Sequence, residues 1–259
     1  MRKTIVAGNW KMYKTISEAI ELANGLKREF FDLSVDDIEI VLCPPFTALS
    51  EVAEVVIGSN IGVGAQDMYW EAEGAYTGEI SPVMIKDAGC RYVIIGHSER
   101  RQFFSETNES VNKKLKAALK YGLTPIVCVG ETLAERERGD TFKVLDDHVK
   151  NGLAQISKEE MIKIVIAYEP VWAIGTGKTA APAQAQEAHH YIRDLLVKLF
   201  DKETAEQVRI QYGGSVKPEN IVELMRQPDV DGGLVGGASL KVDFFSPIVK
   251  QASQVKKPR

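Results

Sequence analysis

The chain has 259 residues, of which 44% are hydrophobic and 26% are charged, as is typical of a soluble globular protein with a sizeable core. Its 32 basic and 36 acidic residues give a net charge of −4 with no basic stripe along the sequence. Because binding to a nucleic-acid backbone requires clustered Lys and Arg, this composition argues against nucleic acid as a partner.

Three cysteines, Cys43, Cys90 and Cys128, are widely spaced and lie in or beside apolar runs. An odd number at such spacing predicts buried free thiols rather than a disulfide framework or a metal site. The first apolar run, TIVAG (4–8), is stopped by Asn9 and is too short for a signal peptide or a membrane span. We therefore expect a protein of the reducing cytoplasm with no membrane partner.

Eight short apolar runs rich in β-branched residues recur along the chain. Each run is nearly continuous in hydrophobicity, which is typical of strands in a parallel sheet that is covered on both faces. We expect strands at 4–8, 38–42, 61–65, 92–96, 125–129, 163–168, 207–212 and 232–236.

Segments with the spacing and caps of amphipathic helices lie between these runs. Thr47 is predicted to cap the second helix, Gly122 to end the third, and Pro218 to lie in the first turn of the last one. The predicted helices cover 17–30, 47–56, 106–122, 181–200 and 217–227.

Strands that alternate with helices over this length predict one closed (β/α)8 barrel domain over residues 1–259, not two domains. The alternative, an open doubly wound sheet, requires a G-x-G-x-x-G fingerprint after the first strand. The sequence there is AGNWKMYK (7–14), which lacks that fingerprint.

Polar residues that follow the expected strands would meet at one rim of such a barrel, where barrel enzymes carry their active sites. Glu169 ends a strongly apolar run and precedes Pro170, a restricted and partly desolvated position in which its pKa could rise. His97, taken alone, fits a structural role as well as a catalytic one. Together the rim residues would place an acid–base pair with cationic support beside glycine-rich turns. The rim set comprises Asn9, Lys11, His97, Ser98, Glu99, Glu169, Ser215, Gly236 and Gly237.

The other three histidines carry weaker signals. His189 and His190 are adjacent on a predicted helix, so their side chains diverge and would not share a metal ion. His148, in the polar stretch DDHVK, is expected on a solvated face.

Two glycine-rich turns follow the last two strands, YGGS (212–215) and GGAS (236–239). Glycine lets backbone N–H groups approach an anion, and the start of a helix behind the turn adds a positive dipole. These turns predict one phosphate site. A third glycine cluster, GTGKT (175–179), looks like an ATPase phosphate loop, but that motif needs a glycine at the position of Trp172. We expect the segment 170–180 to fold over a ligand instead, hinged at its two ends.

Six motifs agree in order and spacing with those of the triosephosphate isomerase family, which the chain resembles from about Lys3 to Gln251. The most specific one is AYEPVWAIGTG (167–177). The others are AGNWKM (7–12), IGHSERR (95–101), CVGET (128–132), YGGSV (212–216) and GLVGGASL (233–240).

The resemblance implies a glycolytic and gluconeogenic isomerase that interconverts dihydroxyacetone phosphate and D-glyceraldehyde 3-phosphate through an enediolate, without cofactor or metal. Glu169 would be the base that moves a proton between adjacent carbons, and His97 the electrophile that polarises the carbonyl oxygen. The family is itself the standard example in which a helix N-terminus lowers the pKa of this histidine and keeps it neutral. Asn9 and Lys11 would stabilise negative charge on the substrate oxygens.

The resemblance also assigns the remaining positions of the rim. Closure of the 170–180 lid would protect the enediolate from loss of its phosphate and strengthen the local electrostatics. The phosphate would bind to backbone N–H groups of Gly175, Ser215, Gly236 and Gly237, and Ser98 and Glu99 would support the catalytic residues.

The segment 66–84 is too long for an ordinary loop in a compact domain, and its three aromatic residues would be poorly placed in water. It therefore predicts a partner interface. The resemblance implies a homodimer in which this loop docks beside the neighbouring subunit's active site, with Thr77 near its tip. Many family members have asparagine at the position of Tyr13, so the details of the interface pocket are open.

Two alternatives also stay open. Another phosphate-binding barrel enzyme, such as an aldolase or a different sugar-phosphate isomerase, would share the phosphate turns, and a Schiff-base aldolase would also need a lysine that projects from a strand into the site. A nucleotide-binding module without enzymatic activity would depend on GTGKT, and its ATP binding would be lost in Lys178→Ala.

Overall fold

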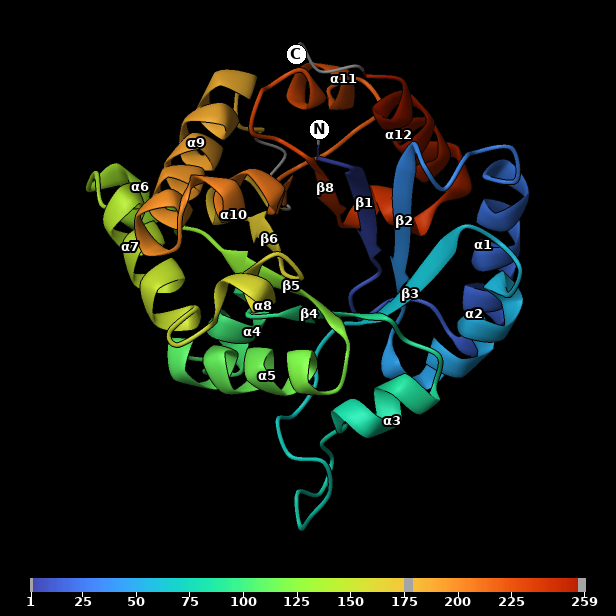
Figure 1. Ribbon diagram of the computed structural model, residues 1–259. Coiled ribbons are helices and arrows are strands. Elements are labelled where there is room, and N and C mark those ends of the chain that lie inside the picture. Colours follow the sequence, from blue (N-terminus) through green and yellow to red (C-terminus); the bar gives the residue numbers. More distant parts are fainter. Residues whose placement is uncertain (1, 175–178, 256–259) are drawn as a thin grey trace.

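The computed structural model describes residues 2–174 and 179–255 and contains a closed barrel of eight parallel strands, which confirms the predicted (β/α)8 fold. Neighbouring strands follow the order of the chain, and β1 pairs with β8 to close the barrel. Figure 1 shows the helices as a ring outside the strands. The strands are β1 (Thr4–Asn9), β2 (Ile38–Cys43), β3 (Ile61–Ala65), β4 (Tyr92–Ile95), β5 (Thr124–Val129), β6 (Val165–Tyr168), β7 (Arg209–Tyr212) and β8 (Gly232–Val235).

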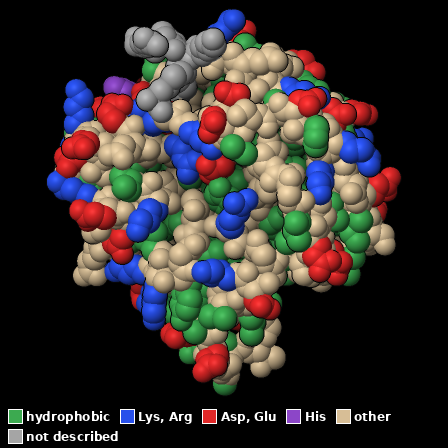
Figure 2. All heavy atoms as spheres, turned by 45° about the vertical axis from the view of Figure 1, so that its right-hand side comes forward, with side chains coloured by type: hydrophobic (Ala, Val, Ile, Leu, Met, Phe, Trp, Pro, Cys, Tyr) green, Lys and Arg blue, Asp and Glu red, His purple; other side chains and the backbone are tan. Residues whose placement is uncertain are grey.

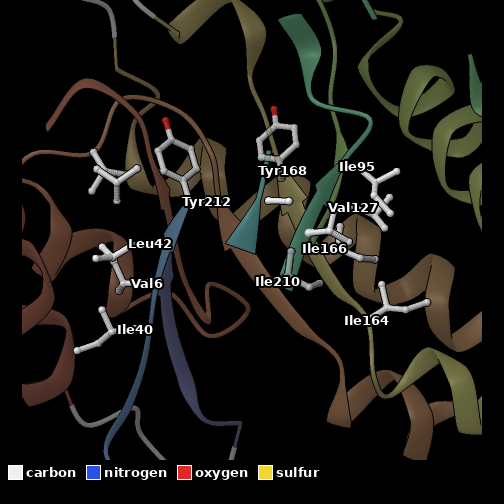
Figure 3. Packing of buried hydrophobic residues seen from close by; sticks show 14 of the residues in the cluster. Val6, Ile40, Leu42, Ile95, Val127, Ile164, Ile166, Tyr168, Ile210 and Tyr212 are labelled. Atoms are coloured by element: carbon white, nitrogen blue, oxygen red, sulfur yellow. The ribbon is translucent and has the colours of Figure 1, made fainter. Parts of the chain in front are cut away.

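Side chains of the strands alternate between two buried layers, because successive residues of a strand point to opposite faces. Ile5 and Val41 belong to a cluster made of strand residues alone, which fills the interior of the barrel. Their neighbours Val6, Ile40 and Leu42 belong to the cluster that packs against the helices (Figure 3). Burial on both faces explains why each predicted run is continuous in hydrophobicity rather than alternating.

The helices cover the outer layer of the barrel and end each βα unit. Several begin with a capping box, as at Thr15, whose backbone N–H and hydroxyl both contact the Glu18 carboxylate at 2.8 and 2.9 Å. They are α1 (Ile16–Glu29), α2 (Leu49–Val56), α3 (Pro82–Asp87), α4 (Ser98–Phe103), α5 (Asn108–Lys120), α6 (Leu133–Glu137), α7 (Thr141–Gly152), α8 (Lys158–Met161), α9 (Pro182–Leu199), α10 (Lys202–Gln207), α11 (Ile221–Met225) and α12 (Val242–Gln254).

Two predicted helix starts are wrong, and one predicted stop is confirmed. Thr47 lies inside a 3-10 turn that precedes α2, so it caps nothing. Pro218 lies before α11, in a turn closed by a hydrogen bond from the Lys217 N–H to Asn220 Oδ1 at 2.8 Å. Gly122 follows α5 with a φ of 70°, a left-handed conformation that favours glycine at the end of a helix.

The segment 66–84 leaves the end of β3 and extends away from the barrel, as the lower part of Figure 1 shows. Its last three residues form the first turn of α3, which the sequence did not predict; Ser81 Oγ caps that helix by accepting the Met84 N–H. Within the projection, the Tyr69 ring stacks on that of Trp70 with centroids 4.0 Å apart.

The three cysteines are buried and free, as predicted. Within residues 2–174 and 179–255, no helix combines the length and the apolar character that crossing a membrane requires.

Candidate active site

A cavity of about 540 Å³ opens where the carboxyl ends of the strands meet. Closure of the barrel between β1 and β8 brings residues from the two ends of the chain to its wall. The cavity wall contains six of the residues predicted from the sequence, namely Asn9, Lys11, His97, Ser215, Gly236 and Gly237. Gly175, the remaining predicted phosphate ligand, lies outside the described residues, as do Thr176, Gly177 and Lys178 of the expected lid.

Glu169 lies directly after β6, is only 2% exposed, and reaches the cavity through its contact with His97, which lines it. Its Oε1 is 2.9 Å from His97 Nε2. Its Oε2 accepts the backbone N–H of Ser98 at 2.9 Å, and the Ser98 hydroxyl donates to Oε1 at 3.2 Å. Glu169 and His97 are therefore in direct contact, and Ser98 contacts the same carboxylate.

The expected rise in the pKa of Glu169 is wrong. Burial does raise the pKa, but the His97 ring and the two Ser98 donors stabilise the carboxylate more strongly, so the net pKa is lowered. The sequence indicated the burial of this strand end, but the partners come from the β4–α4 junction, which no local pattern links to Glu169.

His97 is the N-cap of α4, and its Nδ1 accepts the backbone N–H of Glu99 at 3.2 Å. An Nδ1 that accepts carries no proton, so the ring proton is on Nε2 and is donated to Glu169. Burial lowers the pKa of His97, but the adjacent carboxylate outweighs it and the pKa is raised. The resemblance implied a lowered pKa for His97. The structure does not show it while Glu169 contacts the imidazole ring.

Lys11 is held in an unusual backbone conformation, with a φ of 53°. Its N–H donates to Asn9 Oδ1 at 3.0 Å, and its carbonyl accepts from the side chain of Gln66 at 2.8 Å. The Nζ atom lies 2.6 Å from Glu99 Oε1. A Cβ added to Gly236 would lie 3.3 Å from Lys11 Cε, so the lysine stem passes against the glycine turn after β8.

The glycines of the turn after β7 leave room for neighbouring side chains. A Cβ on Gly213 would lie 2.9 Å from Glu169 Cγ, and one on Gly214 would lie 2.3 Å from the Tyr212 hydroxyl oxygen. Asn220 Nδ2 donates to the Ser215 carbonyl at 3.0 Å and fixes the end of the turn. The sequence analysis considered this turn only as a phosphate site and missed the proximity of Gly213 to Glu169.

Sequence reasoning also missed Glu131, a fully buried carboxylate. It accepts hydrogen bonds from the Tyr168 hydroxyl at 3.1 Å and from Trp172 Nε1 at 2.9 Å. Arg136 contacts the same carboxylate at 3.1 Å, and its guanidinium lies 4.5 Å from a ring centroid of Trp172. Through these contacts Trp172 anchors the segment that follows Glu169. They explain why the sequence has a tryptophan there.

His148 is not on a solvated face as expected. Its Nδ1 accepts the Gly130 N–H at 3.3 Å, and burial lowers its pKa to about 4. His189 is fully buried and His190 is exposed, yet the Nδ1 atoms of both rings contact Asp229, at its carbonyl and its carboxylate respectively. Among residues 2–174 and 179–255, no three His, Cys, Asp or Glu side chains are grouped so as to hold a metal ion.

A buried carboxylate in contact with an imidazole, an ammonium group and glycine turns around one cavity together define a barrel enzyme that handles a phosphorylated ligand and transfers protons. A comparison with known families makes this class specific. The chain belongs to the triosephosphate isomerase family, whose sequence profile matches residues 4–252.

Individual relatives agree with this assignment. The triosephosphate isomerase of Carboxydothermus hydrogenoformans is 59% identical over 252 residues, which cover 96% of this chain and 99% of the relative. The triosephosphate isomerase of Geotalea uraniireducens is 58% identical over 250 residues, with the same coverage. That of Thermoanaerobacter pseudethanolicus is 55% identical over 249 residues.

Proposed function

We propose that the protein interconverts dihydroxyacetone phosphate and D-glyceraldehyde 3-phosphate. The observation that carries this proposal is the contact between Glu169 and His97 at 2.9 Å beneath a cavity that Lys11 also lines. An aldose–ketose isomerisation needs one base that serves two adjacent carbons and one donor for the carbonyl oxygen, and the site offers both.

The reaction follows from the way these groups are paired. Glu169 removes a proton from the carbon beside the carbonyl, and His97 Nε2–H stabilises the oxygen that becomes negative. The hydroxyl proton passes through His97 to this oxygen, and Glu169 delivers the carbon proton to the former carbonyl carbon. The former hydroxyl oxygen becomes the new carbonyl, so the product is an isomer and nothing is consumed. In the structure the Nε2–H of His97 donates to Glu169. When Glu169 moves away from the imidazole ring to reach the substrate, this N–H becomes free to donate to the substrate oxygen.

Lys11 supplies the positive charge for this step. Its Nζ lies in the cavity wall, and its backbone is fixed by Asn9 and Gln66 rather than by its own preference. A charge that is already oriented needs no reorganisation when the oxyanion forms, which is the main source of electrostatic catalysis.

The direct test is a coupled assay of metal-stripped protein with each triose phosphate. Turnover in both directions supports the proposal, and its absence overturns it. Borohydride trapping with substrate distinguishes the aldolase alternative, for which we expect no covalent adduct. ATP binding that is lost in Lys178→Ala would favour the nucleotide-binding alternative instead.

We also propose a homodimer built on the projecting segment 66–84. This segment has Tyr76 and Met84 exposed by 42% and 54%, and Met12 beside the cavity is exposed by 94%. Figure 2 shows hydrophobic side chains gathered on the lower projection of the molecule. Tyr13, also exposed, lines the catalytic cavity, so this surface reaches the site. Thr77, near the tip, is exposed as well.

Sedimentation tests the dimer. We expect the wild type to sediment as two chains, and Tyr76→Lys to shift it toward one chain, because a buried unpaired charge is costly at an interface. Phe31→Lys is the matched control, since Phe31 is 85% exposed and follows α1, away from the projection. A single-chain wild type, or equal shifts in both variants, would rule out this surface.

A single domain over residues 1–259 and a cytoplasmic location complete the proposal. The closed pairing of β1 with β8 supports the first, because neither half of the barrel has its own closed sheet. Three free buried cysteines support the second. For a single domain we expect one cooperative unfolding transition. For a reducing compartment we expect three titratable thiols after unfolding without reductant.

A further inference from the structure

One partly buried arginine beside the site donates its hydrogen bonds to neutral oxygens. Arg101 lies in α4, one turn after His97, and its Nε donates to the Gly96 carbonyl at 3.0 Å. Its Nη1 donates to Asn108 Oδ1 at 2.8 Å. Its Nη2 is buried and has no hydrogen-bond partner among residues 2–174 and 179–255. Arg100, the preceding residue, instead contacts two carboxylates, at 2.8 and 3.2 Å.

Stability alone does not account for an arginine held in this way. Burial lowers the pKa of Arg101, and the negative charges of Glu106 and Glu169 offset only part of that effect. Removing a cation from water is costly unless ion pairs or a full set of hydrogen bonds offset the cost. The arrangement of Arg101 therefore indicates a role besides stabilising the fold.

The contacts of Arg101 converge on the backbone around His97. Gly96, which precedes His97, has a φ of 74°, and a Cβ there would lie 3.2 Å from Arg101 Nη2. The guanidinium thus lies directly against this glycine and holds its carbonyl. The backbone N–H of Arg101 also donates to the His97 carbonyl at 3.1 Å. Arg101 consequently fixes the peptide planes on both sides of the His97 Cα.

The other side of the guanidinium is anchored to the outer ring of helices. Asn108, which accepts from Nη1, is the first residue of α5. Its Nδ2 donates to Asp147 Oδ2 in α7 at 2.8 Å. The position of the Arg101 guanidinium is thus set by α5 and α7 as well as by its own helix.

We propose that Arg101 is a positioning residue that fixes the backbone of His97 and thereby aims its Nε2–H at the substrate oxygen, an inference that rests on the proposed function. Glu169 contacts the ring at 2.9 Å, but it leaves the ring when it reaches the substrate. The peptide planes held by Arg101 then keep His97 in place. Because His97 acts on the oxygen that becomes negative, its misplacement weakens binding of the transition state more than binding of the substrate. We therefore expect kcat to depend on Arg101 and KM to be nearly independent of it.

The experiment compares changes at Arg101 with a matched change at a second partly buried arginine. Arg101→Lys keeps the charge but loses the planar fork of donors, and Arg101→Met removes both. Arg209→Lys is the control, because Arg209 begins β7 at the opposite end of the barrel and contacts Glu39 at 2.9 Å. Values of kcat and KM are measured with each triose phosphate, and thermal unfolding reports the loss of stability in each variant.

We expect kcat to fall by about 10- to 100-fold in Arg101→Met and by about 3- to 10-fold in Arg101→Lys, with KM within about threefold of the wild type. Arg209→Lys should lose stability but keep the kcat of the wild type. Unchanged kcat in the Arg101 variants, a change confined to KM, or an equal loss of kcat in Arg209→Lys would overturn the proposal. If Arg101→Met does not fold, Arg101→Lys decides by the same criteria.

The ring of His97 gives a second measurement that does not depend on turnover. In the structure its Nδ1 accepts the Glu99 N–H and its Nε2 carries the proton, so the neutral ring is a single tautomer. The ¹⁵N shifts of the ring, assigned by their loss in His97→Gln, should stay well separated in the wild type and in Arg209→Lys. In Arg101→Lys they should move toward each other as the tautomers mix, and unchanged shifts would overturn the proposal.

The two measurements separate this inference from the proposed function. A wild type without turnover would overturn the proposed function. Movement of the ring shifts in Arg101→Lys alone would still support the positioning of His97 by Arg101, because the tautomer is read without substrate.

Discussion

At the amino-terminal end of the barrel, Arg193 lies between two carboxylates and donates to Asp231 Oδ2 at 2.8 Å. Arg2 contacts the other oxygen of Asp231 at 2.9 Å. At the carboxyl-terminal end, Glu169 contacts His97 at the same distance, but this pair lies beside an open cavity. Both ends thus contain buried charges, and the difference lies in what surrounds them.

The amino-terminal charges are held by partners that belong to the fold. Two backbone carbonyls, of Ala205 and Val208, take the remaining donors of Arg193. At the other end the carboxylate of Glu169 is stabilised by a ring and a serine that a substrate can replace. A buried charge with fixed partners stabilises the structure, whereas one with exchangeable partners can react.

The largest expected effect is on the carboxyl-terminal pair. Glu169→Gln keeps the size of the side chain and removes the base, so kcat should fall by about 10²- to 10⁴-fold in the triose phosphate assay. Binding of a phosphate-bearing enediolate analogue should persist, because the phosphate is proposed to bind at the glycine turns. The midpoint of thermal unfolding should change little, and a variant with near-normal turnover would remove Glu169 from the role of base.

The second prediction concerns the amino-terminal pair. Arg193→Met takes from Asp231, which is 1% exposed, a charged partner that lies 2.8 Å away. Breaking such a pair should lower the free energy of unfolding by about 3–5 kcal/mol. Guanidinium unfolding at one fixed protein concentration measures this loss. The value of kcat per folded molecule should stay within twofold of the wild type, and a large fall would show that the two ends are not independent.

The fold was predictable from sequence because strands buried on both faces leave a strong local pattern. Each predicted run overlaps one observed strand, such as Val165–Tyr168 within 163–168. The starts of the helices at Thr47 and Pro218 were wrong, since a polar or proline residue before an apolar stretch signals a turn as well as a cap. The same residue types occur in turns and at the first positions of helices. Only tertiary contacts decide which of the two structures forms.

The third prediction uses His189, which links the two ends. Its ring packs edge-on against Tyr168 with centroids 5.7 Å apart, and its Nδ1 contacts the Asp229 carbonyl at 3.1 Å. Burial lowers the pKa of His189 to about 4. Between pH 6.5 and 4 the unfolded chain therefore binds more protons than the folded one, and stability falls as the pH falls.

His189→Gln should remove this dependence. From pH 6.5 to pH 5 the wild type should lose about 1.5 kcal/mol more of its free energy of unfolding than the variant, because the cost approaches about 1.4 kcal/mol per pH unit below the unfolded pKa. Other groups titrate in both proteins, so the difference between the two isolates His189. Parallel stability curves over this range would contradict the assigned burial.

The residues that gather at the cavity were predictable from sequence, but most of their contacts were not. The positions of Asn9, Lys11 and His97 follow from one rule, that barrel chemistry lies after the strands, together with the family motifs. The direction of the pKa shift of Glu169 was wrong, because it depends on Ser98 donors that lie 71 positions away along the chain. Burial can be estimated from local sequence, whereas the partners of a buried charge cannot.

The smallest expected effect compares two glycines that are equally crowded. A Cβ on Gly213 would lie 2.9 Å from Glu169 Cγ, and a Cβ on Gly64 would lie 2.9 Å from Cys43 Sγ. Each substitution by alanine should destabilise the fold by about 1–3 kcal/mol through overpacking. Only Gly213→Ala displaces the proposed base, so only that variant should also lose about 10-fold in kcat. Equal kcat values in the two variants would mean that Glu169 tolerates displacement. The two ends of the barrel would then differ in the partners of their buried charges but not in how exactly those charges must be positioned.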